Sequence, residues 1–121
     1  MLQYAEVQDL HNLFSLLLNK PFSSIVANLE VLRFYDELSV LEKRRSQVQD
    51  RLIQQYGFQN KDGSFSITPA DNQYFEFIKK FNELQSTSVE LSKLNLNIED
   101  FCFPLTPAQV KLLRLVLTIN T

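Results

Sequence analysis

The residue types best suited to nucleophilic or metal chemistry are scarce, because His11 and Cys102 are the only histidine and the only cysteine. An activated nucleophile needs a neighbouring base, and zinc needs three or four protein ligands, so this pair supplies neither. No glycine-rich phosphate loop or nucleophile elbow occurs. We expect an exposed or capping His11 and a buried Cys102 that packs as a small hydrophobe. The sequence thus predicts no catalytic residue, no metal site and no cofactor, and a protein that is not an enzyme.

Carboxylates offer a second route to chemistry, through a general acid and base on opposite sides of a cleft. Glu76 and Glu83 fall on the polar side of a predicted amphipathic helix, where solvated acids belong. Glu99 and Asp100 form an acidic turn. Nothing in this spacing requires two carboxylates to face each other.

Basic residues cluster once, at Lys43, Arg44, Arg45 and Arg51. Arg44 and Arg51 share one helical stripe, whereas Arg45 points with the apolar seam. Acids interrupt the run, so we favour a solvated or ion-paired face over contact with a partner or with phosphates. The net charge of −2 and the pI near 5.3 supply no basic field. We expect no appreciable binding to duplex DNA at physiological salt.

Composition indicates one globular domain over residues 1–121. Hydrophobic residues make up 45% and charged residues 21%, and two glycines and four prolines leave little room for linkers. The sequence shows no signal peptide and no long apolar run. We therefore expect a location in the cytoplasm of a bacterial host or in a virion, with no membrane partner.

The elements that would position any site centre on one long helix from Pro21 to Gly57. Ser23 or Ser24 is the expected N-cap and Gly57 the expected left-handed residue after the helix. At 100° per residue, an early apolar cluster lies nearly opposite a later one. We therefore predict that the apolar face switches sides near Val31 to Tyr35, with a mild kink or none. The early cluster is Phe22, Ile25, Leu29 and Leu32, and the later one is Phe34, Leu38, Leu41, Val48, Leu52 and Tyr56.

The remaining pattern predicts three shorter helices and a small sheet. Leu2 to Val7 is a candidate strand, followed by a helix from a cap at Asp9 to about Asn19. Asp62-Gly63 predicts a hairpin turn. Thr68 and Thr106 each precede a proline and begin helices, the second of which runs to about Ile119. Ser88 to Ile98 alternates as a strand whose phase slips at Ser92-Lys93.

Together these elements predict an α+β fold that is mostly helical. The long helix lies at its centre with about three further helices and a small antiparallel sheet or hairpin. The helix that begins at Thr68 should fold back antiparallel on the second half of the long helix, because the linker between them is short.

The order of these elements resembles small uncharacterised proteins encoded by phages and prophages. The resemblance covers nearly the whole chain and implies a source and a fold rather than an activity. It rests on Leu41-Glu42-Lys43, Tyr56-Gly57, Lys61-Asp62-Gly63, Leu84, Val89-Glu90-Leu91 and Leu105-Thr106-Pro107.

We therefore expect a non-enzymatic phage-type accessory protein that binds another protein or itself. It would be a virion or assembly component or a self-associating module, with an inhibitor of a host enzyme or defence system as the alternative. A small-ligand or nucleotide-binding protein is a further alternative. The apolar surplus of the central and final helices favours a homo-oligomer. The expected partner-binding residues are Val31, Tyr35, Leu112, Leu115, Val116, Arg44, Arg51 and Phe75.

Overall fold

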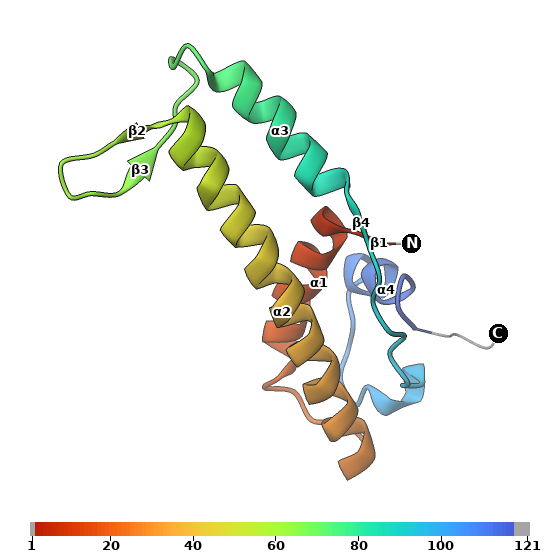
Figure 1. Ribbon diagram of the computed structural model, residues 1–121. Coiled ribbons are helices and arrows are strands. Elements are labelled where there is room, and N and C mark those ends of the chain that lie inside the picture. Colours follow the sequence, from red (N-terminus) through yellow and green to blue (C-terminus); the bar gives the residue numbers. More distant parts are fainter. Residues whose placement is uncertain (1, 118–121) are drawn as a thin grey trace.

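The computed structural model describes residues 2–117 of the 121. Within them the chain forms a mostly helical α+β fold of four α-helices and two small antiparallel sheets of two strands each (Figure 1). The elements in chain order are β1 (Leu2–Gln3), α1 (Tyr4–Leu17), α2 (Ile25–Tyr56), β2 (Phe58–Gln59), β3 (Phe65–Ser66), α3 (Tyr74–Ser86), β4 (Ser88–Val89), the 3-10 turn η1 (Ile98–Asp100) and α4 (Pro107–Leu113).

Helix α2 is the frame of the molecule. Its 32 residues span about 48 Å at 1.5 Å per residue, which exceeds the width of a domain this small. The Ser24 side chain accepts a hydrogen bond from the Ala27 N–H at 3.1 Å, as an N-cap should. The predicted long helix and its Ser24 cap are therefore confirmed.

The predicted switch of apolar face in α2 is wrong. One continuous row is buried, from Ala27 through Val31, Phe34 and Leu38 to Arg45. These residues follow a spacing of three or four, apart from the step between Leu38 and Arg45, which Leu41 bridges as a partly buried side chain. The early cluster of Ile25, Leu29 and Leu32 lies on the opposite side and is exposed. A helix covered along one side cannot bury both clusters.

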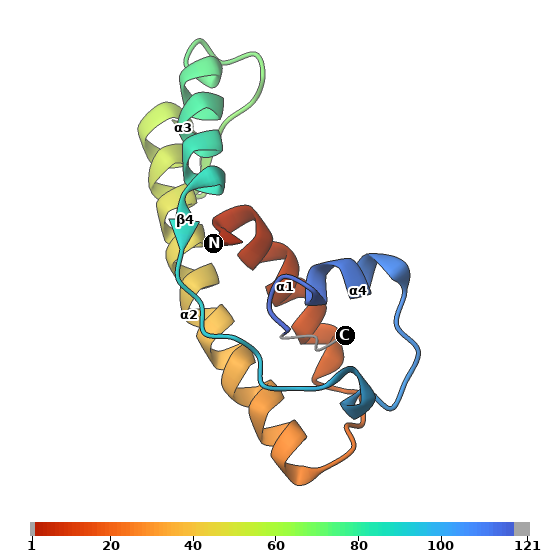
Figure 2. The same cartoon turned by 90° about the vertical axis from the view of Figure 1, so that its right-hand side faces the viewer.

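Different elements cover the two halves of this buried row. Helix α1 packs against the first half and α3 against the second, and Figures 1 and 2 show α3 running back alongside the far end of α2. The predicted antiparallel return of α3 is confirmed. The main core lies between α1 and the first half of α2, where Val7, Leu10, Phe14, Phe34 and Leu38 are fully buried.

Helix α3 begins later than its sequence signature predicts. The Asp71 carboxylate accepts the Thr68 N–H at 2.7 Å, and the Asp71 carbonyl accepts the Tyr74 N–H at 3.1 Å. The Thr-Pro-x-Asp sequence thus closes a turn, and the helix starts at Tyr74. Phe77 and Leu84 bury its apolar side, as the pattern predicted.

Helix α1 begins earlier than predicted, because Gln3 rather than Asp9 is its N-cap. Glu6 accepts the Gln3 backbone N–H at 3.0 Å and closes a capping box. The candidate strand at the start of the chain is therefore only two residues long, and it pairs with β4 through Leu2 opposite Val89 and Gln3 opposite Ser88.

Beyond β4 the chain runs along α2 as an extended segment, residues 90–97, which we call the strap (Figure 2). Val89, just before the strap, is buried and Leu91 is half-buried. Farther along the strap, Leu94 and Leu96 are buried. The predicted phase slip between Leu91 and Leu94 is confirmed. The strap is not a strand of a larger sheet. Apart from the local turn in which the Asn97 carbonyl accepts the Asp100 N–H, its only backbone partner in the described chain is the segment at Val116 and Leu117.

The last helix is shorter than predicted. Thr106 and Gln109 form the expected capping box, but α4 ends at Leu113. Turns follow, and Leu94 donates its N–H to the Val116 carbonyl at 3.1 Å. Ile119, the predicted end of this helix, lies outside the described residues.

The two glycines are required for different structural reasons. Gly63 has a φ of 91° in the hairpin between β2 and β3, which confirms the turn. Gly57 has a φ of −95°, so its predicted left-handed conformation is wrong. A Cβ at Gly57 would lie 2.2 Å from the Ser66 carbonyl oxygen and 2.5 Å from that of Ile53. Gly57 is therefore required by a close approach of backbones.

Replacing each glycine by alanine tests this distinction. We expect Gly57→Ala to lower the free energy of unfolding by about 2–3 kcal/mol, because backbone atoms must move apart to admit the methyl group. Gly63→Ala meets open space and should lose only about 1 kcal/mol from its left-handed conformation. Denaturant titration of both variants measures the two losses. A smaller loss for Gly57→Ala than for Gly63→Ala would contradict this account.

Candidate functional site

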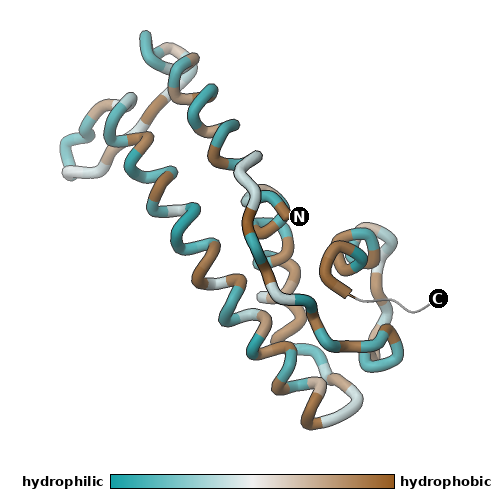
Figure 3. The backbone as a smooth tube through the Cα atoms, turned by 45° about the vertical axis from the view of Figure 1, so that its right-hand side comes forward, coloured by the Kyte–Doolittle hydropathy of each residue, from teal (hydrophilic) through white to brown (hydrophobic). Residues whose placement is uncertain are grey.

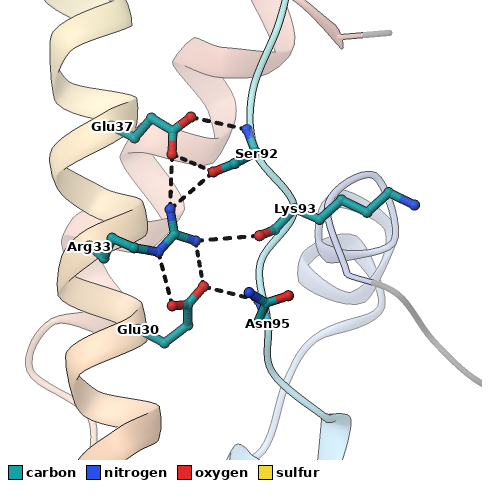
Figure 4. A network of polar contacts seen from close by, with 6 residues as sticks. All are labelled: Glu30, Arg33, Glu37, Ser92, Lys93 and Asn95. Carbon is teal, nitrogen blue, oxygen red and sulfur yellow. Dashed lines mark hydrogen bonds and ion pairs between the residues drawn. The ribbon is translucent and has the colours of Figure 1, made fainter.

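A network of polar contacts joins α2 to the strap (Figure 4). We call it the clamp, and it consists of Glu30, Arg33 and Glu37 on the helix and Ser92, Lys93 and Asn95 on the strap. The Arg33 guanidinium contacts both helix carboxylates, with Nε to Glu30 at 2.9 Å and Nη1 to Glu37 at 3.0 Å. Its third nitrogen, Nη2, also bonds to Glu30. A helix spacing of three and four places these side chains side by side.

The clamp holds the strap mainly through its backbone. Glu37 accepts the Ser92 N–H at 3.0 Å, and Glu30 accepts the Asn95 N–H at 3.1 Å. Arg33 donates to the Lys93 carbonyl at 3.3 Å and to the Ser92 hydroxyl at 3.0 Å. Regular strand geometry would turn the backbone groups of Ser92 and Lys93 to opposite sides. Because α2 binds both, the clamp accounts for the phase slip at these two residues.

The clamp shifts the pKa values of its charged groups. The hydrogen bond from Arg33 lowers the pKa of Glu30, and the bond from Asn95 adds to it against the opposing effect of burial. Burial alone would raise the pKa of Glu37, but the two hydrogen bonds from Ser92 and the charge of Arg33 outweigh it and lower the pKa. The hydrogen bond to Glu30 raises the pKa of Arg33. Both carboxylates are ionised and bonded to Arg33, so the clamp fastens the strap and offers no group poised for proton transfer.

Removing one carboxylate should weaken the clamp in a pH-dependent way. Since the pKa of Glu37 is lower in the folded chain, its stabilisation is complete above the unfolded value of about 4.3 and is lost as pH falls through the folded value. We expect Glu37→Gln to lose about 1 kcal/mol at pH 7 and to lose less stability than wild type on acidification. Glu76→Gln, on the exposed side of α3, is the control. Parallel unfolding curves of Glu37→Gln and wild type from pH 7 to 3 would exclude this role.

Arg45 is the basic residue that the structure buries, at 4% exposure. It makes two hydrogen bonds of 2.8 Å to Glu42 and further bonds to Gln49 and to Gln85 on α3. The prediction that Arg45 points with the apolar seam is confirmed. Arg44 and Arg51 lie on the surface, as expected of a solvated face.

Truncating these two arginines separates the buried role from the exposed one. Arg45→Ala leaves Glu42 without its partner and opens the contact between α2 and α3, so we expect a loss of about 3 kcal/mol in unfolding free energy. Arg44→Ala should change it by less than about 0.5 kcal/mol. Thermal and denaturant unfolding measure both variants. Equal losses would show that Arg45 does not fasten α3.

The single histidine takes part in the contact between α1 and α2. His11 on α1 stacks on Tyr35 of α2 with ring centroids 5.1 Å apart, and its Nε2 lies 3.2 Å from the Ser39 hydroxyl. His11 is thus half-buried between two helices. Cys102 is exposed, so its predicted burial is wrong. The hydrophobic positions on either side of it instead pack with Phe22, whose ring lies 5.3 Å from Phe101 and 5.5 Å from Phe103.

The predicted partner-binding residues do not form one surface. Val31 and Val116 are buried in the core of the chain itself, so they cannot belong to an exposed interface as predicted. Tyr35 and Leu112 are half-buried against that core. Leu115, at 45% exposure, and Phe75, at 84%, lie on different elements, and Phe75 projects from α3.

Leu115 and Val116 do meet part of the strap at a groove. This groove has a volume of about 710 Å³ and is open to solvent. Its apolar lining comes from Leu2, Val89, Leu91, Leu115 and Val116, and its polar lining from Glu37, Glu90, Ser92 and Lys93. Glu37 and Ser92 are already bonded within the clamp. Within residues 2–117, no group of three or more His, Cys, Asp or Glu could hold a metal ion.

Exposed apolar side chains gather at the start of α2, and three of them, Ile25, Leu29 and Leu32, belong to the early cluster that was predicted to pack against another element. We call the group the α2 patch: Ile25, Val26, Leu29 and Leu32, exposed by 78%, 77%, 60% and 49%. Hydrophobic positions recur through these first turns of the helix in Figure 3. The sequence itself indicates that this cluster is exposed, because the row from Ala27 to Arg45 already forms the buried side of the helix.

Comparisons of the chain with family models, with curated proteins and with solved structures find no match. Among the described residues, no helix is both long and apolar enough to cross a membrane.

Proposed function

We propose that this chain is a non-enzymatic protein-binding module, and that the α2 patch is the surface that contacts its partner. Its resemblance to small phage- and prophage-encoded proteins supports a role as a phage-type accessory protein. The observation that carries the proposal is the exposure of four neighbouring apolar side chains in the first turns of a helix whose other side is already buried.

The size of the α2 patch supports this proposal. Its four residues, backbone included, expose roughly 450 Å² together, within the range of the largest apolar patch on a typical monomer, which is often functional. Isolated exposed residues such as Phe75 are common on protein surfaces, whereas contiguous ones favour association. A virion or assembly component and an inhibitor of a host enzyme or defence system would both use such a surface.

The groove beside the strap supports a second candidate, a small-ligand or nucleotide-binding protein. Its volume of about 710 Å³ falls within the range of ligand pockets. Two of its polar side chains, Glu37 and Ser92, are already engaged by the clamp, which leaves Glu90 and Lys93 as its remaining charged lining. The α2 patch is the stronger basis for a function.

A single charge tests the proposed surface. Leu29→Glu places a carboxylate in the middle of the α2 patch, and it should keep the helical content because Leu29 is exposed. We expect wild type to self-associate in light scattering, or to retain an identified host protein at fixed stoichiometry that binds again as a purified pair. Leu29→Glu should lose this association.

Val48→Glu is the matched control, on the same helix about 28 Å from Leu29 and also exposed. It should associate as wild type does. A wild type that is monomeric and retains no partner would contradict the proposal, and so would a Leu29→Glu variant that associates like wild type.

A further inference from the structure

We infer that the partner of the α2 patch is a second copy of this chain, bound antiparallel with the two-fold axis between Leu29 and Leu32. The inference rests on the proposed function and adds the identity of the partner and the geometry of the contact. Three features of the described residues support it: the symmetry of the patch, its area and the position of Asp36.

The spacing of the α2 patch is self-complementary. Ile25, Leu29 and Leu32 are four and three residues apart and form one stripe of the helix, which Asp36 continues four residues later. In an antiparallel pair centred between Leu29 and Leu32, Leu29 of each copy therefore lies opposite Leu32 of the other, and Ile25 lies opposite Asp36. Two-fold homodimers use one patch in this way, with each contact made twice.

The area of the α2 patch also suits a dimer. Complete burial of these four residues in both copies would cover roughly 900 Å², and a specific interface needs about 1,000 Å² or more in total. The exposed residues Asn28 and Asp36 lie beside the patch and would supply the remaining polar rim. Without a partner, the same apolar atoms stay in water.

Asp36 gives the pair its charge complementarity. It lies four residues after Leu32, about 8 Å from the axis along the helix and in line with the patch. The N-cap Ser24 of the second copy lies about 10 Å from the axis on that side. The first turn of α2 has no acidic residue to meet the positive end of its helix dipole. The Asp36 carboxylate of each copy would take that place, and no ion pair within the described chain engages it.

Cysteine cross-linking tests the geometry directly. In a background that carries Cys102→Ser, Leu29→Cys places the two thiols about 5 Å apart along the helices, within reach of a disulfide. Ile25→Cys places them about 16 Å apart along the helices, too far for one. Under mild oxidation we expect a reducible covalent dimer from Leu29→Cys and far less from Ile25→Cys. Equal cross-linking of the two variants would overturn the antiparallel arrangement, and no cross-linking of Leu29→Cys would overturn the dimer.

Sedimentation velocity over a concentration series tests the energetics. We expect wild type to dimerise, Leu29→Glu to be monomeric, and Asp36→Asn to raise the dissociation constant by about threefold to tenfold because both copies lose a helix-dipole contact. Asp50→Asn, an exposed acid farther along α2, should leave it unchanged. A dimer that Leu29→Glu leaves intact would contradict the inference.

The outcome for the proposed function can be distinguished from the outcome for the dimer. A monomeric wild type that binds a different purified protein through Leu29 would refute the second copy as partner and leave the proposed function standing. A monomeric wild type with no partner would refute both.

Discussion

A 32-residue helix longer than the body that surrounds it can be covered along one side only, and the rest of the structure follows from that constraint. Helix α1 covers the first half of the buried row and α3 the second. The two halves of α2 bury different kinds of side chain. The first half of α2 buries Val31, Phe34 and Leu38 in an apolar core, whereas the second buries Arg45 in a set of hydrogen bonds with Glu42 and Gln85.

The clamp determines which part of α2 remains free. Glu30, Arg33 and Glu37 bind the strap along one flank of the helix, and α1 lies against the buried row. Neither element reaches the outer side, where Leu29 is exposed. The α2 patch is therefore exposed because the strap and α1 are bound to other sides of the helix. Its apolar side chains lie beside a polar network that is satisfied within the chain and needs no partner of its own.

Local rules predicted the elements of this fold more successfully than their packing. The long helix, the Asp62-Gly63 turn and the phase slip after Leu91 depend on capping, turn geometry and alternation, all of which act over a few residues. The interfaces could not be predicted in the same way. Leu29 and Val31 have similar hydrophobicity, and only the position of α1 decides that one is exposed and the other buried. The role of Arg33 depends on a strap about sixty residues away.

The central claim, that two copies meet antiparallel through the α2 patch, is tested most directly by a distance between copies. Lys43→Cys, in a background carrying Cys102→Ser, provides a single thiol for a spin label. It lies 14 residues beyond Leu29 on the exposed side of α2. Pulsed dipolar spectroscopy should then give a distance of about 40 Å between the two labels, twice the rise from the two-fold axis to Lys43. The absence of a dipolar signal at concentrations far above the dissociation constant of a typical dimer, or a distance near 10 Å as in a parallel pair, would contradict the account.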